Sequence, residues 1–125
     1  MYSYFLVMAG GAIGAALRFA LSRALPLVAG GWPWATFFTN VAGSLLMGVL
    51  AFWLVAKGAA AEASRLLLGV GLLGGFTTFS AFSLEIGQMV GRGQMTMAFG
   101  YAVASVLLAL IALFAGMALA KAIWA

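Results

Sequence analysis

Hydrophobic positions along the chain form four long runs, separated by short stretches of breakers and charged residues. The runs extend from about Tyr4 to Ser22, from Trp34 to Ala56, from Leu66 to about Val90, and from about Gln94 to Ala120. A helix of about 20 apolar residues crosses the hydrocarbon core of a bilayer. The first run has no basic residue before it and no cleavage pattern, so we expect a retained helix and not a signal peptide. We predict an all-α membrane protein, with residues 1–125 forming a single four-helix transmembrane domain.

The composition supports a lipid environment and excludes several classes of function. Hydrophobic residues make up 66% of the chain and charged residues 6%, whereas about 25% charged residues is usual in soluble proteins. The net charge of +4 comes from scattered Lys and Arg residues, so no basic patch for nucleic acid is expected. Cysteine and histidine are absent, and Glu62 and Glu85 are the only carboxylates. We therefore expect that the protein is not an enzyme.

Basic residues near the ends of the runs give little preference for one orientation in the membrane. Four spans place both termini on one side, together with Lys57, Arg65 and Lys121. The other side holds Arg23 and Arg92, and also Arg18 if its side chain reaches that interface. Orientation usually follows an excess of Lys and Arg on the cytoplasmic side. The near-equal distribution predicts dual topology, in which copies of the chain insert both ways.

Polar side chains recur inside the runs, where each requires a partner or a water-filled path. In the second run, Thr36, Asn40 and Ser44 follow one another at four-residue spacing and so share one helix face. In the fourth run, Tyr101 and Ser105 also share a face. Taken one at a time, the hydroxyl groups of these Ser, Thr and Tyr residues are best explained by hydrogen bonds between helices. Asn40 and its stripe, taken together, favour an ion or water path.

The third run contains the sequence with the most specific signal, Gly-Gly-Phe-Thr-Thr-Phe-Ser-Ala-Phe-Ser at residues 74–83. Adjacent glycines, threonines and serines are poor helix formers. This segment lies at the centre of its run, so an interruption there would free backbone carbonyls at the bilayer midplane. Such backbone is tolerated where it lines a cavity or coordinates an ion. We predict a broken third helix, and a kinked but continuous helix is the alternative.

The segment 74–83 resembles the G-G-x-T-T-F-S-T-F-S signature of the fluoride channel family, also called Fluc or CrcB-type proteins. The resemblance covers the whole chain, because the other three runs also carry motifs similar to those of the family. These motifs are Leu17-Arg18-Phe19, Trp32-Pro33-Trp34 followed by Thr39-Asn40-Val41 and Gly43, and Gly100-Tyr101-Ala102 with Ser105. Ala81 is a departure, because the commoner family pattern has threonine there.

The resemblance implies an antiparallel, dual-topology homodimer with two separate pores. Such a protein would pass fluoride out of the cell across the bacterial plasma membrane, reducing fluoride toxicity in the cytoplasm. Asn40 would be the pore asparagine, and the ring edges of Phe79 and Phe82 would contact fluoride. The other polar residues along or near the pore would be Thr36, Ser80, Ser83, Tyr101 and Ser105. Carbonyl groups of Gly74 and Thr77 would bind a structural Na⁺ at the dimer axis, and Arg18 would be the first-helix arginine with a structural role.

These roles are compatible with general physical chemistry. Four helices enclose little space, so a wet path would form where two subunits meet. In an antiparallel pair, the breaks of the two third helices would meet at the midplane, where their carbonyl oxygens suit a hard cation such as sodium. Fluoride is strongly hydrated, and its water would be replaced by the Asn40 amide, hydroxyl donors and the positive edges of phenyl rings.

Two other functions are compatible with four apolar helices. A proton-coupled small multidrug exporter needs an intramembrane carboxylate, and by resemblance that acid would lie in the first helix. The first run holds Arg18 and no acid, while Glu85 lies roughly 10 Å from the midplane at the rise of a helix. A non-transporting assembly subunit is the second alternative. Asn40 and the breakers of the third run argue against it.

Overall fold

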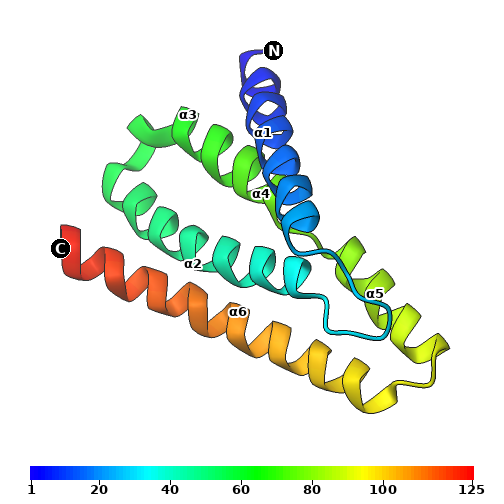
Figure 1. Ribbon diagram of the computed structural model, residues 1–125. Helices are drawn as coiled ribbons and strands as arrows, with labels where there is room; N and C mark the ends of the chain where they lie inside the picture. Colours follow the sequence, from blue (N-terminus) through cyan, green and yellow to red (C-terminus); the bar gives the residue numbers. More distant parts are fainter.

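The computed structural model describes residues 1–125 and contains helices only (Figure 1). The absence of strands confirms the predicted all-α class. Long helices alternate with short turns and with one π-helical stretch. In chain order the elements are α1 (Tyr2–Ala24), α2 (Trp34–Lys57), the 3-10 turn η1 (Gly58–Ala61), α3 (Glu62–Ser64), the π-helix η2 (Arg65–Leu73), α4 (Gly74–Phe76), α5 (Ser80–Gly91) and α6 (Met95–Trp124).

Three helical stretches are long and apolar enough to cross a membrane, namely Tyr2–Ala24, Trp34–Gly91 and Met95–Trp124. The second stretch is not straight, because the chain reverses at η1 so that α2 and η2 form the two legs of a hairpin (Figure 1). The interval 57–65 between the second and third apolar runs is therefore a tight helical turn. Its sequence explains this, since Gly58 takes a positive φ of 61° that ends α2, and the alanines after it favour helix.

The loops 25–33 and 92–94 lie at one end of the molecule, opposite η1 and the two termini (Figure 1). The Gln94 side chain joins them, because its Nε2 donates to the Gly30 carbonyl oxygen at 2.9 Å. Its Oε1 accepts a hydrogen bond of 2.9 Å from Arg92 Nε. The two loops are therefore held together by side-chain contacts as well as by the helices that enter them.

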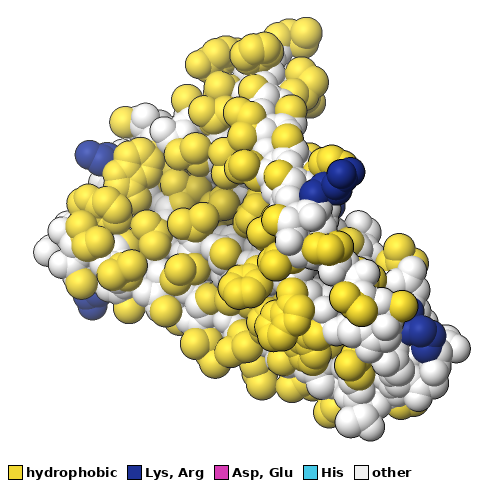
Figure 2. Space-filling view, in the orientation of Figure 1, with side chains coloured by type: hydrophobic (Ala, Val, Ile, Leu, Met, Phe, Trp, Pro, Cys, Tyr) yellow, Lys and Arg dark blue, Asp and Glu magenta, His cyan; other side chains and the backbone are white.

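The surface is that of a protein embedded in lipid. Only 18 of 125 residues are buried in the single chain, although hydrophobic residues make up 66% of the sequence. Figure 2 shows a largely hydrophobic face on which Lys and Arg form separate small patches. Large side chains such as Phe5, Phe99 and Phe114 are more than half exposed, which water would oppose strongly. The chain is a multi-pass membrane protein.

Glycines allow the helices to approach closely at two places. Gly10 and Gly14 of α1 lie against η2 and α4, where an added Cβ would collide with backbone atoms. Gly48 and Gly116 have the same role between α2 and α6. Close backbone approach through small residues is a common means of helix association in membranes. Gly10 and Gly14 are four residues apart on one helix, whereas Gly48 and Gly116 lie on different helices.

The backbone leaves helical geometry between α4 and α5, at residues 77–79. Thr77 is extended, with φ −79° and ψ 158°. Its N–H and its Oγ1 both donate to the Leu73 carbonyl oxygen, at 3.0 and 2.9 Å. Thr78 Oγ1 accepts a hydrogen bond of 3.1 Å from the Ala81 N–H at the start of α5. The two threonines thus satisfy one group on each side of the interruption, as capping residues do.

Candidate functional site

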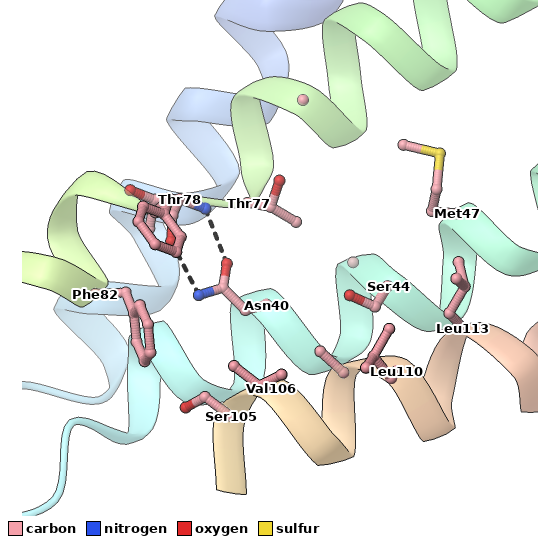
Figure 3. A pocket seen from close by; sticks show the side chains of 14 residues that line it. Asn40, Ser44, Met47, Thr77, Thr78, Phe82, Ser105, Val106, Leu110 and Leu113 are labelled. Atoms are coloured by element: carbon pink, nitrogen blue, oxygen red, sulfur yellow. Dashed lines mark hydrogen bonds between the residues drawn. The ribbon is translucent and has the colours of Figure 1, made fainter. Parts of the chain in front are cut away.

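A groove of about 480 Å³ opens beside this interruption, between α2, α5 and α6. Figure 3 shows side chains of these elements converging on it from opposite sides. The α2 wall is partly polar, whereas the α6 wall is apolar beyond Ser105. The polar and aromatic lining residues are Asn40, Ser44, Thr77, Thr78, Phe79, Phe82 and Ser105, with Gly43 and Gly74 beside them. The structure therefore brings together Asn40, both phenylalanines, Ser105 and the two residues expected at the sodium site.

Asn40 is bonded to the interrupted backbone by both ends of its side-chain amide. Its Nδ2 donates to the Thr78 carbonyl oxygen at 3.0 Å. Its Oδ1 accepts a hydrogen bond of 2.8 Å from the Thr78 N–H. Figure 3 shows the two parallel contacts as dashed lines between α2 and the turn above it. The sequence predicted a pore residue at this position and did not predict its bonding to the turn.

The two phenylalanines flank the groove in different environments. The ring of Phe79 is 77% exposed in the single chain, whereas that of Phe82 is 7% exposed. Their ring centroids lie 5.6 Å apart with an interplanar angle of 55°. Phe82 also packs against Tyr101, with centroids 5.1 Å apart. Phe82 is therefore part of the core, and Phe79 is available to a ligand or to another molecule.

A second polar cluster forms around Glu85, separate from the residues that line the groove. Thr36 Oγ1 donates to Glu85 Oε2 at 2.6 Å. Tyr101 Oη donates to Glu85 Oε1 at 2.9 Å. Thr36 and Tyr101 were predicted along the pore, and the structure instead pairs their hydroxyl groups with this carboxylate. Sequence reasoning gave Glu85 no role, although an acid within an apolar run signals a need for hydrogen-bond donors.

The serines expected along the pore differ in position. Ser80 and Ser83 are exposed at the start of α5 and do not line the groove. The Ser80 hydroxyl lies 3.3 Å from Thr78 Oγ1. Ser105 lines the groove and is 6% exposed, and its hydroxyl has no hydrogen-bond partner within the chain. Ser105 therefore has an unused donor beside the groove, as does Ser44 of the α2 stripe, which also lines it.

Backbone oxygens near the interruption fall into two groups. The Gly75 carbonyl accepts a hydrogen bond of 3.3 Å from Arg18 Nε, so Arg18 ties α1 to the end of α4. No such bond reaches the carbonyl oxygens of Gly74 and Thr77, and both residues line the groove. No group of three or more acidic residues, His or Cys is present to bind a metal through side chains. Any cation held here would use backbone oxygens, which suit a hard ion such as Na⁺.

Comparison with known proteins identifies the family. The model of the CrcB-like proteins, "Camphor Resistance (CrcB)", matches residues 5–117. A protein of Hyphomonas neptunium named "Fluoride-specific ion channel FluC" is 53% identical over 131 residues, covering 100% of both chains. Proteins of the same name are 50% identical over 127 residues in Phenylobacterium zucineum and 48% identical over 127 residues in Caulobacter vibrioides, again covering 100% of both chains. The fluoride channel resemblance read from the sequence is confirmed, and the chain belongs to the CrcB-like family.

Proposed function

We propose that this protein is a fluoride-specific ion channel that releases fluoride passively across the bacterial plasma membrane. Relatives named fluoride-specific ion channels support this function. The structural observation that carries it is a groove lined by neutral polar and aromatic groups, with no charged side chain among its lining residues. Passive release would keep the cytoplasmic fluoride concentration low and so reduce fluoride toxicity.

The physical case rests on the cost of dehydrating a small anion. Moving a bare ion into a medium of low dielectric constant costs on the order of 20 kcal/mol, so substitutes for water are obligatory. Conduction also requires that the ion leave again, which disfavours a full positive charge in the filter. The positive edges of Phe79 and Phe82 and the Ser105 hydroxyl supply partial charges of the required sign. Thr36, Ser80, Ser83 and Tyr101 would act beside this pathway rather than in it.

Fluoride efflux from liposomes tests the function directly. Purified protein is reconstituted into vesicles loaded with potassium fluoride, and a fluoride electrode records release after a potassium ionophore is added. We expect rapid release that protein-free vesicles do not give. Vesicles loaded with potassium chloride and followed with a chloride electrode serve as the selectivity control. Protein-containing vesicles that retain fluoride would contradict the proposal.

An antiparallel homodimer with four crossings per chain is the assembly we propose. The crossings are α1, α2, the third helix from η2 to α5, and α6. A single chain leaves the groove open on one side and leaves Phe79 77% exposed. A second copy facing the groove would close it and would bury this ring, giving a path shielded from lipid. The two chains together would form two such paths.

Dual topology is the first prediction from this assembly. Reporters fused to the C-terminus are expected on both sides of the membrane in similar amounts, because basic residues divide almost equally between the two ends. Two added lysines in the turn at residues 58–61 should retain that turn in the cytoplasm and bias the ratio. A C-terminus found entirely on one side would contradict dual topology.

A structural Na⁺ at the dimer axis is also part of the proposal. The carbonyl oxygens of Gly74 and Thr77 fit such an ion because both residues line the groove and neither oxygen accepts a hydrogen bond. The ion would neutralise exposed carbonyl dipoles and hold two subunits together. Replacing sodium with N-methyl-D-glucamine is therefore expected to reduce fluoride efflux and the dimer fraction measured by crosslinking. Unchanged efflux and unchanged crosslinking in the sodium-free buffer would argue against the site.

A proton-coupled exporter has less support as the alternative function. Such a protein needs a carboxylate in the path of its substrate. Glu85 does not line the groove, and both of its oxygens accept hydrogen bonds from Thr36 and Tyr101. A non-transporting assembly subunit has no use for a groove of this composition.

A further inference from the structure

Two hydrogen bonds link Asn40 to the interrupted third helix across the groove. They join α2 to a residue 38 positions further along the chain, with lengths of 2.8 and 3.0 Å. Both backbone groups of Thr78 are used, and so are both heteroatoms of the Asn40 amide. The contact therefore pairs both backbone groups of Thr78, and one N–H of Asn40 Nδ2 has no further partner in the chain.

The chemistry of the turn accounts for an amide at this position. Thr78 lies outside helical geometry, so its N–H and C=O have no partner along the backbone. Backbone groups left unpaired at membrane depth cost several kcal/mol each. Among uncharged side chains, only those of Asn and Gln present a donor and an acceptor side by side in one plane. A hydroxyl group cannot reach both groups of Thr78, and a carboxylate lacks the donor.

The consequence concerns the groups next to Thr78. Phe79 follows Thr78 directly, and the Thr78 hydroxyl oxygen accepts a hydrogen bond from the Ala81 N–H at the start of α5. A contact that fixes Thr78 against α2 therefore fixes the ring of Phe79 and the start of α5 relative to the α2 wall of the groove. We infer that Asn40 is a positioning residue, which holds the interrupted backbone of the third helix through Thr78 and influences fluoride through that backbone. The functional part of this inference rests on the proposed fluoride pathway.

The first experiment measures the contact itself and does not depend on transport. Amide hydrogen exchange at Thr78 is followed by NMR in the purified protein and in the Asn40→Ala and Asn40→Asp variants. Exchange is expected to become roughly tenfold faster in Asn40→Ala, as the loss of a single hydrogen bond allows. In Asn40→Asp the N–H keeps an acceptor, so its protection should remain closer to that of the parent. Ser44→Ala, one turn along α2 in the same groove, is the control and should leave Thr78 exchange unchanged.

The second experiment separates positioning from direct contact with fluoride. Replacing Thr78 with its α-hydroxy acid turns the amide between residues 77 and 78 into an ester. This removes the N–H that donates to Asn40 Oδ1, while every side chain stays in place. If Asn40 acts through Thr78, the ester lowers fluoride efflux, and Asn40→Ala in the ester protein costs much less than it does in the amide protein. The ester also weakens the Thr77 carbonyl, so the non-additivity of the two changes is the decisive quantity.

The two experiments distinguish the positioning role of Asn40, its contact with Thr78 and the proposed function. Additive effects of the ester and Asn40→Ala would overturn the positioning role and leave Asn40 as a direct ligand. If the exchange rate of the Thr78 amide hydrogen is the same in the parent and in Asn40→Ala, Asn40 does not hold Thr78 and the inference is wrong. If Asn40→Ala does not assemble, an ester protein with parental efflux would still contradict the inference. A parent protein that passes no fluoride would refute the proposed function, while the exchange measurement would still decide the contact.

Discussion

Phe79→Ile is expected to reduce fluoride efflux by roughly tenfold to a hundredfold while the protein still assembles. Isoleucine keeps apolar bulk but removes the ring, whose positive edge is the feature that attracts an anion. The estimate assumes an interaction similar to a hydrogen bond with a charged group, about 1.5–3 kcal/mol. Phe79 is 77% exposed in the chain, so its replacement removes little packing within one subunit. Efflux from liposomes, normalised to the amount of dimer, measures the effect.

Phe82→Ile is expected to have a comparable effect on efflux together with a loss of stability. Its ring is 7% exposed and packs on Tyr101, so a smaller side chain leaves a gap in the core. Phe79→Tyr and Phe82→Tyr retain a ring and are the matched controls. If assembled isoleucine variants release fluoride as fast as the parent, ring edges do not contribute to the pathway.

The fold was predictable to the extent that hydrophobic periodicity and breakers determine it. Four apolar runs predicted helices whose ends differ from those observed by a few residues, as at α1 and α6. The π-helical geometry of η2 was not predicted from the sequence, and neither was its close packing against α1. A Cβ added to Gly71 of η2 would lie 2.9 Å from the Val7 carbonyl oxygen. Close contacts of this kind follow from the packing of two helices and leave no local pattern.

The candidate site was predictable as a set of residue types and less so as a set of contacts. Asn40, Phe79, Phe82 and Ser105 were expected near one another and do line one groove. Their hydrogen bonds depend on how far α2 lies from the interrupted backbone, which the sequence does not encode locally. For the same reason, the sequence did not predict that the hydroxyl groups of Thr36 and Tyr101 donate hydrogen bonds to Glu85.

Glu85 is also a residue whose replacement is expected to have a large effect. Glu85 accepts hydrogen bonds from two hydroxyl groups, at 2.6 Å from Thr36 and 2.9 Å from Tyr101. Tyr101 is fully buried and packs against Trp32, with ring centroids 5.2 Å apart. The cluster thus connects α2, α5 and α6 at the end of the bundle that carries the loops 25–33 and 92–94.

Glu85→Ala is expected to destabilise the protein strongly, because it leaves both hydroxyl donors without an acceptor. Each buried unsatisfied group costs about 1–3 kcal/mol, so the two together cost roughly 2–6 kcal/mol. Glu85→Gln keeps the shape and one carbonyl acceptor, and should lose much less. Glu62→Ala is the matched control, since this glutamate is exposed on α3 and bonds only to Arg65. Ion pairs on an exposed surface contribute about 0–1 kcal/mol.

Thermal unfolding in detergent, followed by tryptophan fluorescence, measures the order of stability of these variants. Glu85→Ala that unfolds at the same temperature as Glu62→Ala would mean that the cluster contributes nothing to stability, and that the two hydroxyl groups find other acceptors.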